Sequence, residues 1–250
     1  MAKIVNIAAY KFLSMGEPAS KLAPLRTEIK AQLQRLGLKG TVLLAPEGIN
    51  LFLAGERESV DGFLTYLRQL PGLGDLTVKE SLSDRVPFQK LMVKLKKEII
   101  SFRQPEVDPV RDGAPRISPE ELKQWLDEGK PVVLLDTRNS YEVDAGTFQG
   151  AVTLPLRDFT HFPEAVKRAM APDESRPVVT FCTGGIRCEK AAPFLARQGV
   201  RQVYQLEGGI LNYFEKVGGA HYAGNCFVFD DRGAVTPTLQ PAGAGADQIG

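Results

Sequence analysis

The sequence predicts two domains, an N-terminal α+β domain of the split βαβ type and a C-terminal α/β domain built on a parallel sheet. Strand and helix patterns alternate in the order β-α-β-β-α-β up to residue 82. Continuous apolar runs such as residues 132–135 then indicate strands that are covered on both faces. Residues 105–116 lie between the two patterns and carry three prolines without periodicity, which predicts a linker.

The N-terminal elements follow from the spacing of apolar residues. A helix pattern begins at Ser20, places apolar side chains at three- and four-residue steps, and ends at Gly37. Pro46-Glu47-Gly48-Ile49 lies between two strand patterns and predicts a hairpin whose glycine takes a positive φ. The predicted strands are residues 4–12, 41–45, 50–54, 77–82 and 91–102. This order favours a ferredoxin-like sandwich with one added strand.

The C-terminal elements indicate a parallel sheet, because helix patterns separate successive apolar strands. Ser118-Pro119-Glu120-Glu121 is a capping box that begins the first helix. The predicted strands are residues 132–135, 150–155, 178–181 and 202–206, and the later helices are residues 161–170, 188–198 and 209–216. We divide the whole chain into a domain at 1–104, a linker at 105–116, a second domain at 117–222, a strand extension at 223–235 and a disordered tail at 236–250.

The stretch with the clearest chemistry is Cys182-Thr183-Gly184-Gly185-Ile186-Arg187-Cys188, which follows an apolar strand and precedes a helix. Backbone N–H groups of this loop would converge on the sulfur of Cys182, and the helix N-terminus and Arg187 would add positive potential. Such surroundings lower the pKa of a thiol and favour the thiolate, which is the nucleophilic form. We therefore predict Cys182 as the catalytic residue and residues 183–187 as its anion and substrate cradle. The competing interpretation is a buried structural cysteine at a strand end.

The two parts of the chain differ in charge. Residues 1–104 carry 16 Lys and Arg against 10 Asp and Glu, whereas residues 105–250 carry 15 against 20. The basic part is the better candidate to bind an anionic polymer, so we expect it to dock RNA. The candidate RNA-binding residues are Lys90, Lys94, Lys96 and Lys97. Lysines on a strand that only protect a sheet edge are the alternative.

The composition bears on compartment and cofactor. The N-terminal apolar stretch is interrupted by Asn6 and Lys11, so neither a signal peptide nor a membrane span is expected. Three cysteines and two histidines are scattered, which predicts no structural metal and reduced thiols in the cytoplasm. The glycine motifs of dinucleotide and P-loop sites are absent from the sequence, so no cofactor is evident.

Four motifs resemble a rhodanese domain over residues 112–222. They are Asp136-Thr137-Arg138, Gly150-Ala151, the loop from Cys182 to Arg187, and Glu207-Gly208-Gly209. Four residues separate Cys182 from Arg187, which is the loop length of sulfurtransferases, whereas cysteine phosphatases have five there. The resemblance therefore tells against phosphatase activity.

A larger pattern resembles the rhodanese-domain tRNA uridine(34) hydroxylase family over nearly the whole chain. It comprises the split βαβ domain with Pro46-Glu47-Gly48-Ile49-Asn50, then Val86-Pro87-Phe88, the cysteine loop, and the stretch from Asn225 to Arg232. This resemblance implies an oxygen-dependent enzyme that converts the wobble uridine of tRNA to 5-hydroxyuridine, with Cys182 essential and molecular oxygen as a substrate. Two alternatives stay open, a sulfurtransferase that forms a persulfide on Cys182 and a non-catalytic RNA- or protein-binding module.

Several other residues have a structural interpretation. We expect Cys188 and Cys226 to pack as small apolar residues, although each could serve as a partner thiol for Cys182. Asp136 and Arg138 are expected to form a buried, loop-bracing ion pair. Glu207 is expected either to border the pocket or to cap the following helix. His161 and His221 are expected to be surface or packing residues, and Tyr213 and Phe214 to belong to a helix core, although one of these two could face the pocket.

Overall fold

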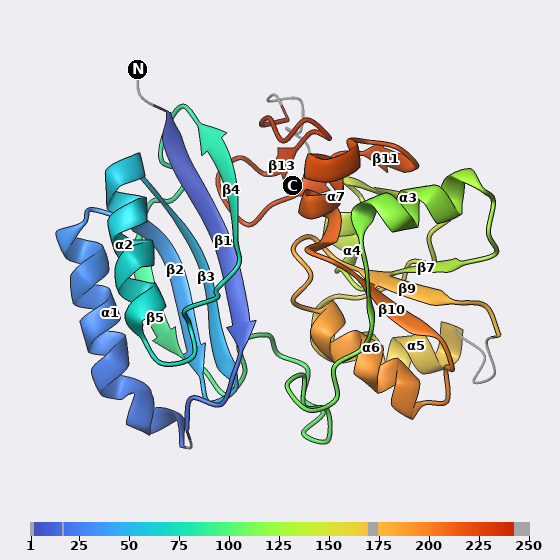
Figure 1. Cartoon of the computed structure of the whole chain (residues 1–250), viewed down its shortest axis with the longest axis horizontal. Helices are drawn as coiled ribbons and strands as arrows, with labels where there is room; N and C mark the ends of the chain where they lie inside the picture. The colour runs from blue at the N-terminus through green and yellow to red at the C-terminus, as the bar shows by residue number, and fades with distance from the viewer. Residues whose placement is uncertain (1–2, 17, 170–174, 243–250) are drawn as a thin grey trace. The chain divides into compact units, whose positions relative to one another are not determined.

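The computed structural model describes residues 3–16, 18–169 and 175–242. The chain divides into two compact units, Met1–Ser101 and Phe102–Gly250 (Figure 1). Each unit is described here by itself. Within the described ranges no helix combines the length and the apolar character that a membrane span requires.

The N-terminal unit has the predicted ferredoxin-like topology. Its elements are β1 (Ile4–Phe12), η1 (Ala19–Leu22), α1 (Ala23–Arg35), β2 (Lys39–Ala45), β3 (Gly48–Gly55), α2 (Arg57–Gln69), β4 (Val78–Ser83) and β5 (Leu91–Leu95). The strand order is β4-β1-β3-β2-β5, and β5 runs parallel to β2 while the other pairs are antiparallel. The added strand predicted at 91–102 is present, but it ends at Leu95, and residues 96–102 are not part of the sheet.

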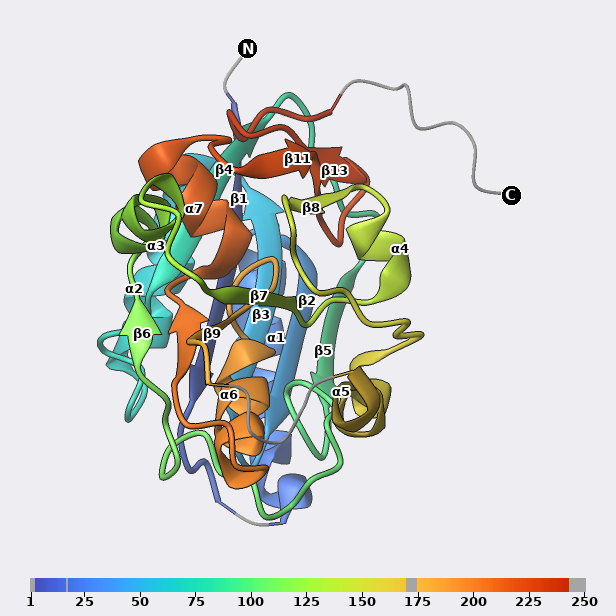
Figure 2. The same cartoon turned by 90° about the vertical axis from the view of Figure 1, so that its right-hand side faces the viewer.

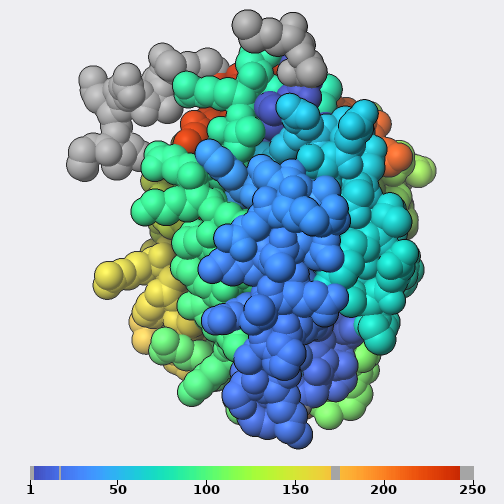
Figure 3. All heavy atoms as spheres, turned by 90° about the vertical axis from the view of Figure 1, so that its left-hand side faces the viewer, coloured from blue at the N-terminus to red at the C-terminus, as the bar shows by residue number. Residues whose placement is uncertain are grey.

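Helices α1 and α2 cover one face of this sheet and are seen in space-filling view in Figure 3. Their apolar sides, including Ile29 and Phe63, are fully buried against the sheet. Gly48 has φ +148°, and a Cβ there would lie 2.1 Å from the carbonyl oxygen of Lys11. The hairpin therefore requires glycine at this position, as the sequence indicates.

The candidate RNA-binding lysines lie on and beside β5, which packs next to α1 (Figure 3). Leu91, Val93 and Leu95 of this strand pack against the core, so the residues between them point away from it. The four lysines at positions 90, 94, 96 and 97 are exposed. The alternation predicted for this strand is therefore present.

The C-terminal unit is a parallel α/β fold with three layers (Figures 1 and 2). Its sheet has the order β6-β10-β9-β7, with every pair parallel. The strands are β6 (Arg116–Ile117), β7 (Val133–Asp136), β9 (Val178–Phe181) and β10 (Val203–Leu206). Helices α3 (Pro119–Asp127) and α7 (Gly209–Val217) lie on one face, and α5 (Phe162–Ala169) and α6 (Cys188–Arg197) lie on the other. The predicted fold class is confirmed for both units.

Short elements surround this sheet. They are α4 (Ser140–Val143), η2 (Phe159–His161), and two antiparallel pairs, β8 (Gly146–Phe148) with β11 (Tyr222–Gly224) and β12 (Cys226–Phe227) with β13 (Ala234–Val235). The aromatic rings of Phe148, Tyr213 and Tyr222 pack edge to face in the core beneath them. The pair of β8 with β11 thus ties the chain after α7 back to the segment after β7.

Three further expectations differ from the structure. The strand predicted at 150–155 is reduced to a single bridge, Leu135 with Val152, so the apolar run there does not extend the sheet. The stretch at 105–116, expected as a linker, packs onto the C-terminal unit, because Asp112 accepts a hydrogen bond from Arg197 at 2.7 Å and Arg116 enters β6. Residues 236–242 of the expected disordered tail form a hydrogen-bonded turn, and 243–250 lie outside the described residues.

Candidate active site

Cys182 lies at the carboxyl end of β9, at the first position of the loop that leads into α6. The N–H group of Gly185 donates to the sulfur at 3.1 Å, and Gly185 has φ +100°, which an L side chain rarely adopts. The loop thus turns inward on the sulfur as the sequence predicts. Cys182 is 0% exposed, so a substrate reaches it only when groups around the loop move aside.

The N-terminus of α7 holds this loop from a second side. Ile210 N–H donates to the carbonyl oxygen of Cys182 at 2.9 Å, and Leu211 N–H donates to that of Thr183 at 3.1 Å. Gly209 has φ +65°, and a Cβ there would lie 2.4 Å from the carbonyl oxygen of Cys182. The Gly208-Gly209 pair predicted to precede a helix therefore allows the close approach of α7 to the cysteine loop.

Arg187, the last residue of the cradle, forms a buried ion pair with Glu142. Its Nη1 and Nη2 donate to the two carboxylate oxygens of Glu142 at 2.6 and 2.7 Å. The hydroxyl of Thr183 also donates to this carboxylate, at 3.3 Å. Glu142 therefore joins both ends of the cradle. Nothing in the sequence analysis singled it out, although Asn139-x-x-Glu142 is a capping box that a search for helix starts could have found.

One donor of Arg187 is left over. In the part of the chain that the structure describes, no acceptor lies within hydrogen-bonding distance of its buried Nε. The guanidinium instead lies over the ring of Phe229, with Cζ 5.9 Å from the ring centroid. Arg187 thus keeps one N–H group beside the reactive loop that no described residue uses.

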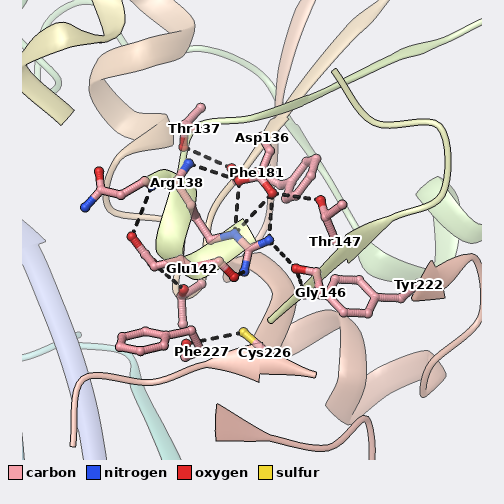
Figure 4. A network of polar contacts seen from close by, with 12 residues as sticks. Asp136, Thr137, Arg138, Glu142, Gly146, Thr147, Phe181, Tyr222, Cys226 and Phe227 are labelled. Atoms are coloured by element: carbon pink, nitrogen blue, oxygen red, sulfur yellow. Dashed lines mark hydrogen bonds and ion pairs between the residues drawn. The ribbon is translucent and has the colours of Figure 1, made fainter. Parts of the chain in front are cut away.

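The segment that carries Glu142 is braced by Arg138 (Figure 4). Arg138 is paired with Asp136, with Nη2 and Oδ2 2.6 Å apart and both side chains 0% exposed. It also donates to the carbonyl oxygens of Glu142 at 3.3 Å and Gly146 at 2.7 Å. Thr147 donates to Asp136 at 2.8 Å. The predicted buried ion pair with a bracing role is confirmed.

The surroundings of Cys182 favour its thiolate. Burial alone would raise its pKa, but a hydrogen bond from Cys188, the charge of Arg187, and the N–H groups of Arg187 and Gly185 outweigh burial and lower the pKa to about 6. The pKa of Cys188 is raised well above its usual value, by burial and by its hydrogen bond to Cys182. One sulfur is therefore the anion and the other the donor.

The three cysteines carry free, buried thiols. Cys188 begins α6, and its sulfur lies 3.9 Å from the hydroxyl of Thr137. Cys226 lies in β12, where its S–H donates to the carbonyl oxygen of Phe227 at 3.6 Å (Figure 4). Burial raises the pKa of Cys226 to about 12. Both thiols pack as the sequence analysis expects, but Cys188 also touches the reactive sulfur through its hydrogen bond.

Two groups of aromatic residues have different places in this unit. Tyr213 and Phe214 are buried in the core, as predicted. Tyr141 and Phe229 are 43% and 46% exposed, and each packs edge to face on Phe227, with ring centroids 5.2 and 5.3 Å apart. The sequence analysis assigned no role to these three residues.

The other predicted residues have simple surroundings. His221 pairs with Asp127 at 2.7 Å, and His161 with Asp158 at 3.2 Å, both near the surface. The carbonyl oxygen of Glu207 accepts a hydrogen bond from the amide of Asn212, one turn into α7.

The candidate lysines belong to the N-terminal unit, whereas Cys182 and its cradle belong to the C-terminal unit. Over the described ranges, His, Cys, Asp and Glu form no cluster of three that could hold a metal ion.

Two family models match the two units of this chain. Residues 4–99 match the family described as UPF0176 acylphosphatase like domain, and residues 118–216 match the Rhodanese-like domain. A solved structure of a rhodanese-like domain from Anabaena is similar to 54% of this chain and 91% of its own, with a TM-score of 0.39 and 21% identity.

Two curated relatives extend over both domains. One from Bordetella petrii is 54% identical over 249 residues, which cover 98% of this chain and 97% of the relative. One from Cupriavidus pinatubonensis is 52% identical over 246 residues, which cover 96% of this chain and 86% of the relative. Both carry the name tRNA uridine(34) hydroxylase. With such identity along both units, the chain belongs to the tRNA uridine(34) hydroxylase family.

Proposed function

We propose that this enzyme acts in the cytoplasm on tRNA and hydroxylates uridine 34 at C5 to give 5-hydroxyuridine, with the Cys182 thiolate as nucleophile. The observation that carries the proposal is the sulfur of Cys182 held by the N–H of Gly185 at 3.1 Å with its pKa lowered to about 6. A thiolate at neutral pH can add to an electron-poor double bond, and C6 of uracil is such a position.

The proposed reaction passes through a covalent bond between Cys182 and the uracil ring. The thiolate forms a bond from Sγ to C6, and the electron pair of the C5–C6 double bond moves to C5. Molecular oxygen, reduced by two small thiols to hydrogen peroxide with release of a disulfide, supplies the electrophilic oxygen. C5 attacks one peroxide oxygen, the O–O bond breaks, and hydroxide leaves. Hydroxide then removes the C5 proton as water, and the C6–S bond breaks to return the thiolate.

Neighbouring groups support these steps. The N–H groups of Gly185 and Arg187 stabilise the thiolate before attack and after its release. The S–H of Cys188 donates to the same sulfur and so also favours it as the leaving group. Glu142 keeps Arg187 and Thr183 in place. These contacts exist in the resting protein, so the groups that stabilise the thiolate are in place before the substrate enters.

We assign tRNA docking to the exposed lysines on and after β5 in the N-terminal unit. Positive side chains on alternate positions of a strand contact phosphates without reading sequence. Replacing Lys94 and Lys96 with glutamine should weaken tRNA binding and lower the slope of log affinity against log salt by about 1 per residue. An unchanged slope would remove these lysines from the interface.

Nucleoside mass spectrometry of tRNA tests the activity. Purified enzyme, tRNA, oxygen and a thiol should give 5-hydroxyuridine, and Cys182→Ser should give none. Omitting oxygen or the thiol should also abolish the product. The loop geometry suits persulfide formation as well, so thiocyanate release from thiosulfate and cyanide is measured in parallel. Thiocyanate release without 5-hydroxyuridine would replace the proposed function with sulfur transfer.

A further inference from the structure

Three aromatic side chains form an exposed cluster beside the cysteine loop. Tyr141, Phe227 and Phe229 contact one another in sequence, with ring centroids 5.2 Å apart in the first pair and 5.3 Å in the second. The two outer rings remain nearly half exposed, at 43% and 46%. Large aromatic residues that stay exposed together mark an interaction surface more often than a packing site.

Arg187 and helix α4 fix the position of this cluster relative to the loop. The guanidinium of Arg187, which belongs to the cradle, lies over the ring of Phe229 at 5.9 Å from the centroid. Phe227 in β12 packs on Tyr141 of α4, the helix that also carries Glu142, the ion-pair partner of Arg187. The segment from Cys226 to Phe229 therefore runs along the loop that begins with the reactive thiol.

The cluster also lies beside an unused polar group. Arg187 is 4% exposed, and its Nε has no hydrogen-bond partner among the described residues. Buried donors are nearly always satisfied in folded proteins, so an orphaned one next to a reactive loop indicates a group that arrives with the substrate. A uracil ring carries two carbonyl oxygens that can accept from such a donor.

We propose that Phe229 is the surface on which the uracil ring of nucleotide 34 stacks when the base is presented to Cys182, with Arg187 donating to a uracil carbonyl. This inference rests on the proposed function and names the residues that bind its substrate. Proteins that recognise unstacked RNA bases use exposed aromatic rings of this kind together with arginine. Phe227 packs edge to face on Phe229 and on Tyr141, so the three rings form one continuous aromatic surface.

The test uses an anticodon stem-loop RNA with uridine at position 34 and a matched RNA that lacks the base there. Binding to the complete enzyme is measured without oxygen, so that no turnover occurs. Phe229→Ala should weaken binding of the uridine RNA by about tenfold to a hundredfold and leave binding of the abasic RNA unchanged. Phe229→Leu should behave like Phe229→Ala, whereas Phe229→Tyr should restore binding, because stacking requires a π face.

A second measurement separates stacking from a packing role. Trp125, the one tryptophan of the sequence, is replaced by phenylalanine, and Phe229→Trp is added. Fluorescence of the new indole should be quenched by the uridine RNA and not by the abasic RNA. Val110→Ala, which removes an exposed apolar side chain elsewhere in the same unit, is the matched control and should leave binding unchanged.

Failure of the stacking role and failure of the proposed function give different results. If the wild type makes 5-hydroxyuridine but Phe229→Ala binds both RNAs like the wild type, the stacking role is overturned and the proposed function stands. Equal weakening for the uridine and abasic RNAs would also overturn it, because the loss would then not involve the base. If the wild type makes no 5-hydroxyuridine, the proposed function itself fails.

Discussion

Two buried arginines in the C-terminal unit each form an ion pair with a buried carboxylate, but they differ in how their remaining N–H donors are used. Arg138 gives its donors to Asp136 and to the carbonyl oxygens of Glu142 and Gly146. Arg187 gives Nη1 and Nη2 to Glu142 and leaves its buried Nε without an acceptor in the described part of the chain. A fully matched arginine braces a fold, whereas one with a spare donor beside a thiol is arranged for a ligand.

Each arginine also has a cysteine nearby, and the two thiols respond in opposite ways. The charge of Arg187 acts on Cys182 together with loop N–H groups, so that its pKa falls to about 6 despite burial. The charge of Arg138 acts on Cys226, but burial prevails and the pKa rises to about 12. A positive neighbour therefore does not by itself create a thiolate; the hydrogen bonds to the sulfur decide.

Of the changes to the two arginines and their cysteines considered below, removing the charge at Arg187 should have the largest effect on activity. We pair Arg187→Met with Glu142→Gln, because a lone buried carboxylate would otherwise destabilise the protein. The double variant should lower the single-turnover rate of uridine hydroxylation by about 10²- to 10³-fold, the cost of losing one key donor in an active site. The pKa of Cys182, followed by the ultraviolet absorbance of its thiolate, should rise towards its usual value. A double variant with the wild-type rate and the wild-type pKa of Cys182 would show that Arg187, like Arg138, contributes only to the fold.

Removing Arg138 should instead affect stability. Arg138→Met leaves Asp136 buried and unpaired, which should cost about 3–5 kcal/mol of unfolding free energy. Urea unfolding followed by Trp125 fluorescence reports on this unit. Arg111→Met, which breaks a largely exposed ion pair with Asp112, is the matched control and should change stability by about 1 kcal/mol or less. Equal losses for the two variants would contradict the bracing role.

The parts of the fold that could be predicted are those encoded by local pattern. The apolar steps from Leu22 to Leu36 and the glycine at position 48 specify α1 and the hairpin directly. The run at 150–155 is also apolar but forms only the bridge between Val152 and Leu135 of the edge strand β7, and the apolar pattern does not show how far such pairing extends. The sequence predicts a linker at 105–116, because the hydrogen bond that attaches this stretch joins Asp112 to Arg197, which lies far along the chain.

The same distinction holds for the site. Cys182, Gly185 and Arg187 are close in sequence, so their convergence could be predicted from the loop itself. Glu142 and Phe229 reach the loop from 45 and 42 residues away along the chain, and only the tertiary fold brings them to Arg187. A long-range ion pair and a ring contact leave no periodic signal in a single sequence.

Changing Cys188 should have a moderate effect on the thiolate. Cys188→Ala removes the S–H donor and should raise the pKa of Cys182 by roughly one unit, whereas Cys188→Ser supplies an O–H donor and should restore most of the difference. In the wild type, where the pKa is about 6, the hydroxylation rate should fall about tenfold per pH unit below 6 as the thiolate is protonated. In Cys188→Ala that fall should begin at higher pH. An identical pH profile in the two proteins would show that Cys188 donates nothing to the sulfur.

Changing Cys226, the thiol on which the charge of Arg138 acts, should have the smallest effect. Its S–H donates to the carbonyl oxygen of Phe227, and such a bond favours the protonated thiol. Cys226→Ala should therefore leave the pKa of Cys182 unchanged and cost about 1 kcal/mol of stability through lost packing. Thiolate absorbance, urea unfolding and single-turnover hydroxylation are measured on the same preparation. Loss of hydroxylation with intact folding would instead show that Cys226 takes part in the reaction as a partner thiol. Arg138 would then contribute to catalysis as well as to stability.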